Sequence, residues 1–300
     1  MAWYRAGSMK PVLFTLPGLG WEIQAYGFFV ALALVVAWAQ TLRLSRADGF
    51  DPKALGPVFV GSAAAGLLGA RLGWVLQHPG VFDGARSLFS LRAGTMAPFA
   101  GAVVAMIVGG AWVSRMKIRP WAWYDILAPA MALGLVFERL GAFFAGTAFG
   151  RYAPDAALAL RFPVGSPAYA LHQRTLANLM RAGTLESLPV HPVQLYAAAL
   201  GVVALALCVW VRKRRTFDGQ VFLSFAGFYV AVRAFVEEPL RADAPAGVLG
   251  PLNTGQVGAV AMLVVLGVVY GVLQRRGAKG GRVRTAKPGA KRPRKKKRKR

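Results

Sequence analysis

The chain has 300 residues, of which 56% are hydrophobic and 16% are charged. A soluble domain carries about 25% charged residues, so this composition leaves too little polar surface for a water-soluble globule and excludes that class. The net charge of +25 is uneven, because 15 of the 37 Lys and Arg residues lie within 275–300, where there is no acidic residue.

Several apolar stretches are long enough to cross the ~30 Å hydrocarbon core of a bilayer, which takes about 20 helical residues. In chain order, the predicted spans cover residues 23–40, 54–77, 94–113, 121–144, 193–211, 219–236 and 254–273. The segment 145–192 is too polar to span and is predicted to be a small folded insert. The expected fold is therefore all-α, a polytopic membrane helical bundle of about seven spans over residues 1–274, followed by a disordered basic tail over 275–300.

Basic residues in the short loops predict the orientation of these spans. They are frequent in the loops after the first, third and fifth spans, including the run at 212–215, and fewer in the opposite loops, which carry Arg86 and Arg92. The positive-inside rule places the basic loops and the tail in the cytoplasm. Seven spans then put the N-terminus outside, the C-terminus inside and the insert on the extracytoplasmic side.

Small residues in the second predicted span indicate close helix packing. Gly69 and Gly73 form a GxxxG pattern, which allows two helix backbones to approach each other in lipid. We expect these glycines to contribute to packing rather than to chemistry.

Polar and charged side chains gather in the outer half of the predicted spans. A charge inside a spanning helix costs about 2.5–3.5 kcal/mol on insertion scales. The set comprises Gln24, Tyr26, Arg71, Glu138, Arg139, His191, Gln194, Arg233, Glu237, Glu238 and Gln256. Three of these residues are arginines on three different helices, and the planar arginine fork suits phosphate. The pattern predicts a site for an anionic lipid headgroup near the outer interface.

Structural alternatives exist for these residues. Arg71 could extend to the interface, and Arg233 and Glu237, four residues apart, could neutralise each other. Glu138 and Arg139 are adjacent on a helix, so their side chains start about 100° apart and are not expected to pair. His191 could cap the helix that begins at Pro192.

A proline predicts where the sixth span ends. Pro239 disfavours helical geometry at the residue before it, so the helix should end near Glu238. Arg241 then lies in the outer loop, where it can reach lipid headgroups.

Around the polar residues of the outer half, the chain resembles the bacterial phosphatidylglycerol–prolipoprotein diacylglyceryl transferases. The resemblance covers most of residues 20–273. The motifs keep the order and spacing of that family. They are GARLGW at 69–74, the stretch 95–101, RLGAF at 139–143 with Gly150 and Arg151, RFP at 161–163, HPVQLY at 191–196, Tyr229 with Arg233 and Glu237, and TGQ at 254–256.

The resemblance implies a reaction and a set of roles. The family moves the diacylglyceryl group of phosphatidylglycerol to the lipobox cysteine thiol of a prolipoprotein, which forms a thioether and releases glycerol phosphate. Arg139 and Arg233 would clamp the phosphate, and His191 would orient or deprotonate the thiol. Further substrate contacts are expected from Tyr26, Arg71, Gln194, Tyr229, Glu237 and Arg241. The resemblance also implies the bacterial cytoplasmic membrane, prolipoprotein signal peptides as partners, and neither cofactor nor metal.

The sequence departs from the family pattern at several positions. Phe99 stands where the family has His or Tyr, Ala142 replaces an Asn, Thr147 replaces a Glu, and Ala197 follows Tyr196 where a Glu is common. These losses favour an alternative, a catalytically impaired homologue that binds anionic lipid or lipoprotein without turnover. A small-solute transporter is disfavoured, because transporter sites usually lie near the midplane of the membrane.

The basic tail predicts a partner of its own. A run of Lys and Arg binds polyanions. In a membrane chain we expect it to lie against anionic lipid headgroups, each basic residue contributing roughly 1 kcal/mol near the surface. No nucleic-acid partner is expected.

Overall fold

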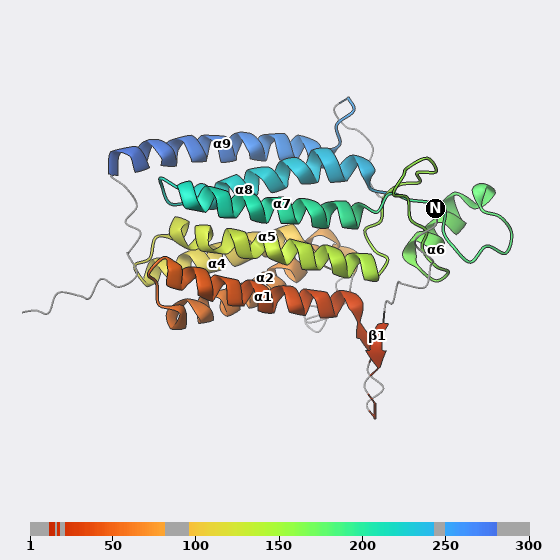
Figure 1. Cartoon of the computed structure of the whole chain (residues 1–300), viewed down its shortest axis with the longest axis horizontal. Helices are drawn as coiled ribbons and strands as arrows, with labels where there is room; N and C mark the ends of the chain where they lie inside the picture. Colours follow the sequence, from red (N-terminus) through yellow and green to blue (C-terminus); the bar gives the residue numbers. More distant parts are fainter. Residues whose placement is uncertain (1–11, 16, 19–21, 82–95, 243–249, 281–300) are drawn as a thin grey trace, which may run out of the picture.

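The protein is described by a computed structural model that covers residues 12–15, 17–18, 22–81, 96–242 and 250–280. Long helices run side by side, and a smaller lobe extends from one end of the bundle (Figure 1). The long helices are α1 (Ala25–Ala47), α2 (Pro52–Gln77), α4 (Pro98–Arg115), α5 (Pro120–Phe144), α7 (Val193–Arg214), α8 (Gln220–Val232) and α9 (Thr254–Gly280). With short turns that continue α8 to Leu240, the described residues form seven helical stretches long and apolar enough to cross a membrane. The predicted number of spans is confirmed.

The helix boundaries follow local chemistry. Proline begins α2, α4 and α5, where its fixed φ suits the first turn and its missing N–H would have no intrahelical partner. α1 continues to Ala47, past the predicted end at residue 40, because hydropathy marks only the apolar part of a helix. α9 likewise passes the predicted boundary at 274 and reaches Gly280. The tail from 281 onwards, and the loop basic residues Arg86 and Arg92, lie outside the described residues.

α5 lies at the centre of the bundle. It packs against α1, α4, α7 and α8, whereas α2 packs mainly against α4. A core of buried apolar side chains joins α5, α7 and α8, and includes Ala128, Cys208 and Phe222. The central position of α5 matters for function because Glu138 and Arg139 lie on it.

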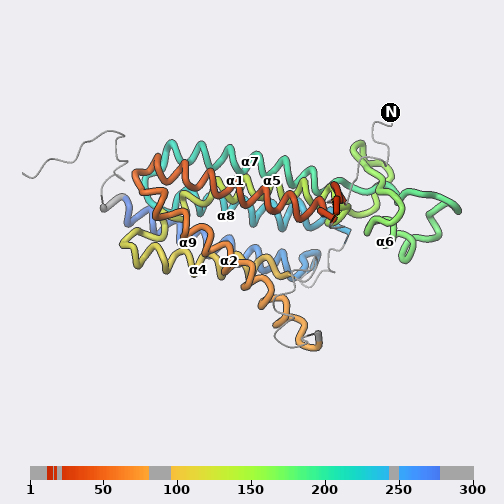
Figure 2. The backbone as a smooth tube through the Cα atoms, turned by 90° about the horizontal axis from the view of Figure 1, so that it is seen from below, coloured from red at the N-terminus to blue at the C-terminus, as the bar shows by residue number. Residues whose placement is uncertain are grey.

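The GxxxG pattern serves the packing of α2 on α4, as predicted. A Cβ atom added to Gly69 would lie 2.6 Å from Cβ of Val104, and one added to Gly73 would overlap Ala100. Only glycine allows this approach. Toward its C-terminus, α2 leans away from the rest of the bundle (Figure 2).

A polar cluster fastens the helix ends opposite the lobe. The fully buried carboxylate of Asp125 on α5 accepts hydrogen bonds from the N–H groups of Gly219 (2.8 Å) and Phe222 (2.9 Å) at the start of α8. Asp48, which follows α1, pairs with Arg212 and Arg215 at 2.8 Å each. Asp125 was not among the residues predicted to have a role. Its signal was a lone carboxylate in the first turns of an apolar helix.

The lobe is the polar segment 145–192. It contains α6 (Pro167–Thr175), the 3₁₀ turn η3 (Ala177–Leu179) and single β-bridges, around a small core of Phe143, Phe162 and Val190. Near the N-terminus, β1 (Val12–Thr15) pairs antiparallel with β2 (Glu22–Gln24). Ile23, expected in the first span, therefore lies in a strand, and the helix begins at Ala25. The described part of the chain is otherwise helical or irregular, as the all-α class predicts.

Candidate active site

The polar residues predicted for the outer half lie at ends of helices near the lobe. α1 and α7 begin at this end, and α5 and the α8 stretch finish there (Figure 1). Helices that alternate in direction bring Tyr26, Gln194, Arg139 and Arg233 to the same end although they are far apart in the sequence. Their contacts show which of them form one cluster.

Arg139 lies between two carboxylates. Its Nε atom is 3.3 Å from Oε2 of Glu138, and its Nη2 atom is 3.3 Å from Oε2 of Glu237. The expectation that the adjacent Glu138 and Arg139 would not pair is wrong. The angle of 100° separates their Cβ atoms, but both side chains are long enough to bend toward each other.

Tyr26 joins α1 to this cluster. Its hydroxyl donates a hydrogen bond to Oε1 of Glu138 at 3.4 Å. Each oxygen of the Glu138 carboxylate therefore has a partner, Tyr26 on one and Arg139 on the other.

Arg233 pairs through an irregular turn. The α-helical pattern of α8 changes to a π turn, η4 (Arg233–Glu237), followed by a 3₁₀ turn, η5 (Glu238–Leu240). A π turn brings residues five apart face to face, so Arg233 pairs closely with Glu238, whereas Glu237 is 3.9 Å away. The predicted pair of Arg233 and Glu237 is thus weaker than the pair of Arg233 and Glu238. Beyond Pro239, the backbone becomes extended at Arg241.

The start of α9 supports the π turn. Gln256 donates from Nε2 to the carbonyl oxygen of Ala234 at 3.0 Å, and Asn253 donates from Nδ2 to Glu238 at 3.4 Å. These bonds fix the backbone and carboxylate that face Arg233. Gln256 and Glu238 were predicted to be in the polar set, whereas Asn253 gains its role only through this packing.

A narrow crevice opens beside Arg139 between α5, α7 and α8. Arg139, Tyr229 and Glu237 line it together with apolar side chains. Each guanidinium has five N–H donors, so two carboxylate neighbours leave further donors for an incoming anion.

His191 and Gln194 lie where the lobe meets α7. The Nε2 atom of Gln194 donates to the carbonyl oxygen of Thr147 at 2.7 Å, while its buried Oε1 atom has no partner among the described residues. The buried Nδ1 atom of His191 likewise has none within the described structure. α7 has no side-chain cap, so the alternative that His191 caps this helix is wrong.

Gly150 brings His191 and Arg241 together. The Gly150 N–H donates to the carbonyl oxygen of His191 at 3.0 Å, and Gly150 forms an antiparallel bridge with Arg241. The Arg151 N–H donates to Leu240 at 2.8 Å. The loop after η5 is thereby fastened to the lobe beside His191.

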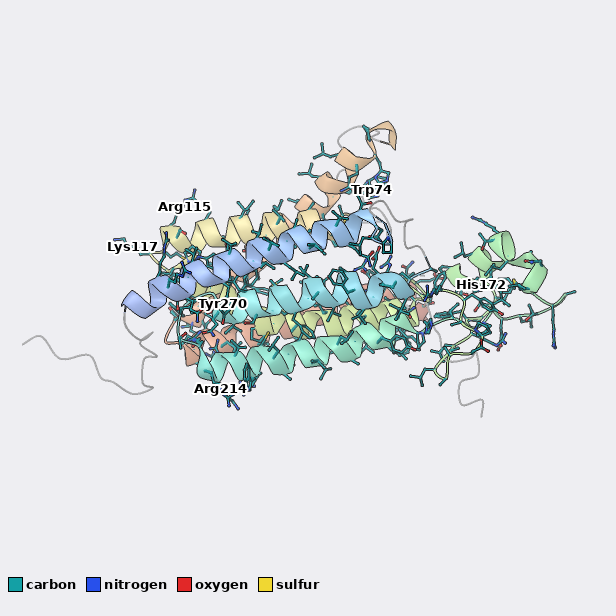
Figure 3. The ribbon with its side chains drawn as sticks, turned by 90° about the horizontal axis from the view of Figure 1, so that it is seen from above. Trp74, Arg115, Lys117, His172, Arg214 and Tyr270 are labelled. Carbon is teal, nitrogen blue, oxygen red and sulfur yellow. The ribbon has the colours of Figure 1, made fainter. Side chains whose placement is uncertain are left out.

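Arg71 lies on the leaning part of α2. Its guanidinium lies over the ring of Trp74, 4.9 Å from the ring centroid. Figure 3 places Trp74 where α2 departs from the bundle. Arg71 is buried, so it does not extend to the interface as the alternative required.

An apolar cavity of about 280 Å³ extends through the bundle between α1, α2, α4 and α5. Trp123 and Glu138 both line it and are 15 residues apart on α5, about 22 Å along the helix. Among the described residues that line this cavity, Glu138 is the one with a charge. The cavity therefore runs along the bundle from Glu138, beside Arg139, to Trp123.

A model of the prolipoprotein diacylglyceryl transferase family matches residues 11–272. The chain belongs to this family. Relatives named phosphatidylglycerol–prolipoprotein diacylglyceryl transferase include one from Geobacter sulfurreducens, 31% identical over 89% of this chain and 96% of that protein. Another, from Thermus thermophilus, is 28% identical over 73% of this chain and 80% of its own length. A third, from Photorhabdus laumondii, is 29% identical over 86% and 90%.

Membership of the transferase family confirms the predicted resemblance and makes this chain a transferase. With its seven apolar helices, it is a multi-pass bacterial membrane protein.

The residues that depart from the family pattern differ in their burial and in their distance from the arginine cluster. Phe99 is 63% exposed in the first turn of α4, and Ala142 is buried in α5. Thr147 contributes its backbone carbonyl, which Gln194 holds, and Ala197 lines the crevice beside Arg139. Arg139, Arg233 and Glu237, which match the motifs of the family, are all present in the cluster.

Proposed function

We propose that this protein transfers the diacylglyceryl group of phosphatidylglycerol to the lipobox cysteine of prolipoproteins. The observation that carries this proposal is the junction of two unlike environments. Arg139 lies beside Glu138 at the point where a long apolar cavity begins. A phospholipid has the same division, with one anionic phosphate next to apolar tails. The names of the relatives support the reaction.

Arg139 and Arg233 are proposed to bind the phosphate. They come from different helices and face the same carboxylate, Glu237, which sets their separation. Negative charge grows on the phosphate as its bond to the glyceryl carbon breaks, and donors fixed in advance stabilise that charge. Tyr229, which lines the crevice beside Arg139, would donate a neutral hydrogen bond to the phosphate, whereas Tyr26 supports the site by donating its one hydroxyl proton to Glu138.

The other predicted contacts surround this clamp. The buried Nδ1 atom of His191 and the buried Oε1 atom of Gln194 have no hydrogen-bond partner among the described residues, so each keeps a hydrogen-bonding capacity that a bound substrate would satisfy. We assign His191 to orient the thiol of the incoming signal peptide and Gln194 to hold a polar group of either substrate. We propose that Arg241, joined to the lobe through Gly150, contacts the headgroup, and that Arg71, buried against Trp74, contacts the bound lipid from α2.

The proposed membrane is the bacterial cytoplasmic membrane, with the lobe outside. Basic loops lie opposite the lobe, and α9 finishes at their end of the bundle (Figure 1). We propose that the tail beyond α9 binds anionic headgroups of the inner leaflet. This orientation places the cluster where an exported precursor meets its lipid donor.

A lipid-transfer assay with purified protein, phosphatidylglycerol and a lipobox peptide tests the proposal. Arg139→Ala and Arg233→Ala should each lower kcat by about 100-fold or more, because each removes donors to the developing charge. Arg181→Ala, which changes an exposed arginine of the lobe, is the control and should keep full activity. Normal transfer by both cluster variants would overturn the phosphate roles. No transfer by the unmodified protein would overturn the function and favour the impaired homologue.

A further inference from the structure

We propose that Glu138 is the general base that removes the proton from the incoming cysteine thiol. This inference rests on the proposed transfer reaction and names a residue for a step that the arginine clamp cannot perform. A thiol has a pKa of roughly 8.5 and reacts as thiolate. Guanidinium groups stay protonated and cannot accept its proton.

The position of Glu138 is the first observation that supports its role as the base. Its carboxylate lies 3.3 Å from Arg139, and the apolar part of its side chain borders the apolar cavity. In a diacylglyceryl phosphate, the carbon that is attacked lies between the phosphate and the tails. If the phosphate binds at Arg139 and a tail enters the cavity, that carbon lies beside Glu138.

The other carboxylates of the cluster are less suited to the task. Their side chains are 5% (Glu237) and 14% (Glu238) exposed, compared with 30% for Glu138. Glu237 faces both arginines, and Glu238 is held by Arg233 and Asn253. Glu138 contacts one arginine and a neutral hydroxyl, so it is the most accessible carboxylate of the three.

Tyr26 and Arg139 orient this carboxylate. Tyr26 donates to Oε1 from the first turn of α1, and Arg139 holds Oε2 from the same helix as Glu138. Two contacts on two oxygens fix the plane of the carboxylate, which leaves a lone pair on each oxygen for a proton. A base held in this way needs no reorganisation when the thiol arrives.

The step balances without another reactant. The thiol proton passes to the Glu138 carboxylate, and the sulfur forms a bond to the glyceryl CH₂ carbon. The bond from that carbon to the phosphate oxygen breaks, and its electron pair leaves with glycerol phosphate. Glu138 then passes its proton to the departing phosphate and is ready for another cycle.

The deciding experiment compares thiol and selenol peptides as acceptors. Glu138→Gln keeps an oxygen for Tyr26 but cannot take a proton. With the thiol peptide at pH 7, this variant should transfer lipid about 100-fold more slowly or worse, with binding of phosphatidylglycerol retained. A selenol is a stronger acid and is ionised without help, so the selenol peptide should restore most of the rate. The deficit with the thiol peptide should also shrink as pH rises toward roughly 8.5.

Two further variants separate a base from a structural charge. Glu138→Asp keeps the carboxylate and should retain part of the thiol activity, which also tests the site if Glu138→Gln folds poorly. Glu237→Gln should weaken lipid binding with both peptides equally, because it disturbs the arginines and not the proton transfer.

The outcomes separate the role of Glu138 from the transfer function. Full thiol activity of Glu138→Gln, or an equal loss with thiol and selenol at every pH, overturns the role of Glu138 and leaves the transfer function standing. An unmodified protein that transfers lipid to neither peptide overturns both.

Discussion

At the scale of single residues, contacts in this site depend on side-chain reach and on backbone space. Glu138 and Arg139 pair although they are adjacent, and Arg233 prefers Glu238 to Glu237. Gly150 illustrates the backbone constraint. A Cβ atom there would lie 2.5 Å from the carbonyl oxygen of His191 and 2.6 Å from its Cβ. The hydrogen bond that joins Gly150 to His191 therefore requires glycine.

Gly150→Ala should destabilise the protein by about 1–3 kcal/mol, because the added methyl group has no space. It should also lower transfer activity, since His191 and Arg241 share this junction. Thermal unfolding in detergent measures the first effect. Gly258→Ala on α9, where a Cβ atom meets nothing within 4 Å, is the matched control and should be neutral or slightly stabilising. Equal unfolding temperatures for Gly150→Ala and the unmodified protein would contradict this account.

At the scale of elements, short irregular segments position the cluster. The π turn η4 rotates Arg233 toward Glu238, and the start of α9 holds that turn through Gln256. The lobe is held by His172 on α6. This buried ring accepts, at Nδ1, a hydrogen bond of 3.1 Å from the Leu188 N–H, three residues before His191. Burial lowers the pKa of His172 from its ordinary value of 6.5.

A lowered pKa makes the stability of the lobe depend on pH. The unfolded lobe binds a proton on His172 more readily than the folded lobe, so stability rises with pH in this window. The stabilisation is fully present above about pH 6.5 and is lost as pH falls through the lower pKa of the folded state. We expect the hydrogen-exchange protection factor of the Leu188 amide to fall between pH 7 and pH 5. In His172→Gln this dependence on pH should disappear. A protection factor that stays constant between pH 7 and pH 5 in the unmodified protein would refute the role of His172.

At the scale of the whole molecule, charge separates the two ends of the bundle. The lobe and the arginine cluster lie at one end, and the basic loops after α1, α4 and α7 lie at the other (Figure 1). The positive-inside rule assigns the basic end to the cytoplasm. The chain has one cysteine, Cys208, which is buried, so introduced cysteines can report the orientation.

Labelling with a membrane-impermeant thiol reagent tests this orientation. Arg181→Cys in the lobe should react in cells whose outer membrane is permeabilised, whereas Lys53→Cys and Ala290→Cys should react only once the cytoplasmic membrane is opened. In proteoliposomes, anionic lipid should slow the labelling of Ala290→Cys but not of Lys53→Cys if the tail binds the headgroups as proposed. The unmodified protein controls for Cys208. Reaction of Lys53→Cys in closed cells would reverse the proposed orientation.

The sequence by itself determined the number of spans, the polar insert and the family. Hydropathy identifies the membrane spans, because a spanning helix must bond its backbone polar groups internally and present apolar side chains to lipid. Motif order identified the arginines. Tertiary structure alone decided which carboxylate faces which arginine, that Asp125 caps α8 from another helix, and that Glu138 lies where the apolar cavity begins. These features depend on distances between helices and on a π turn, neither of which is encoded in the period of a single helix.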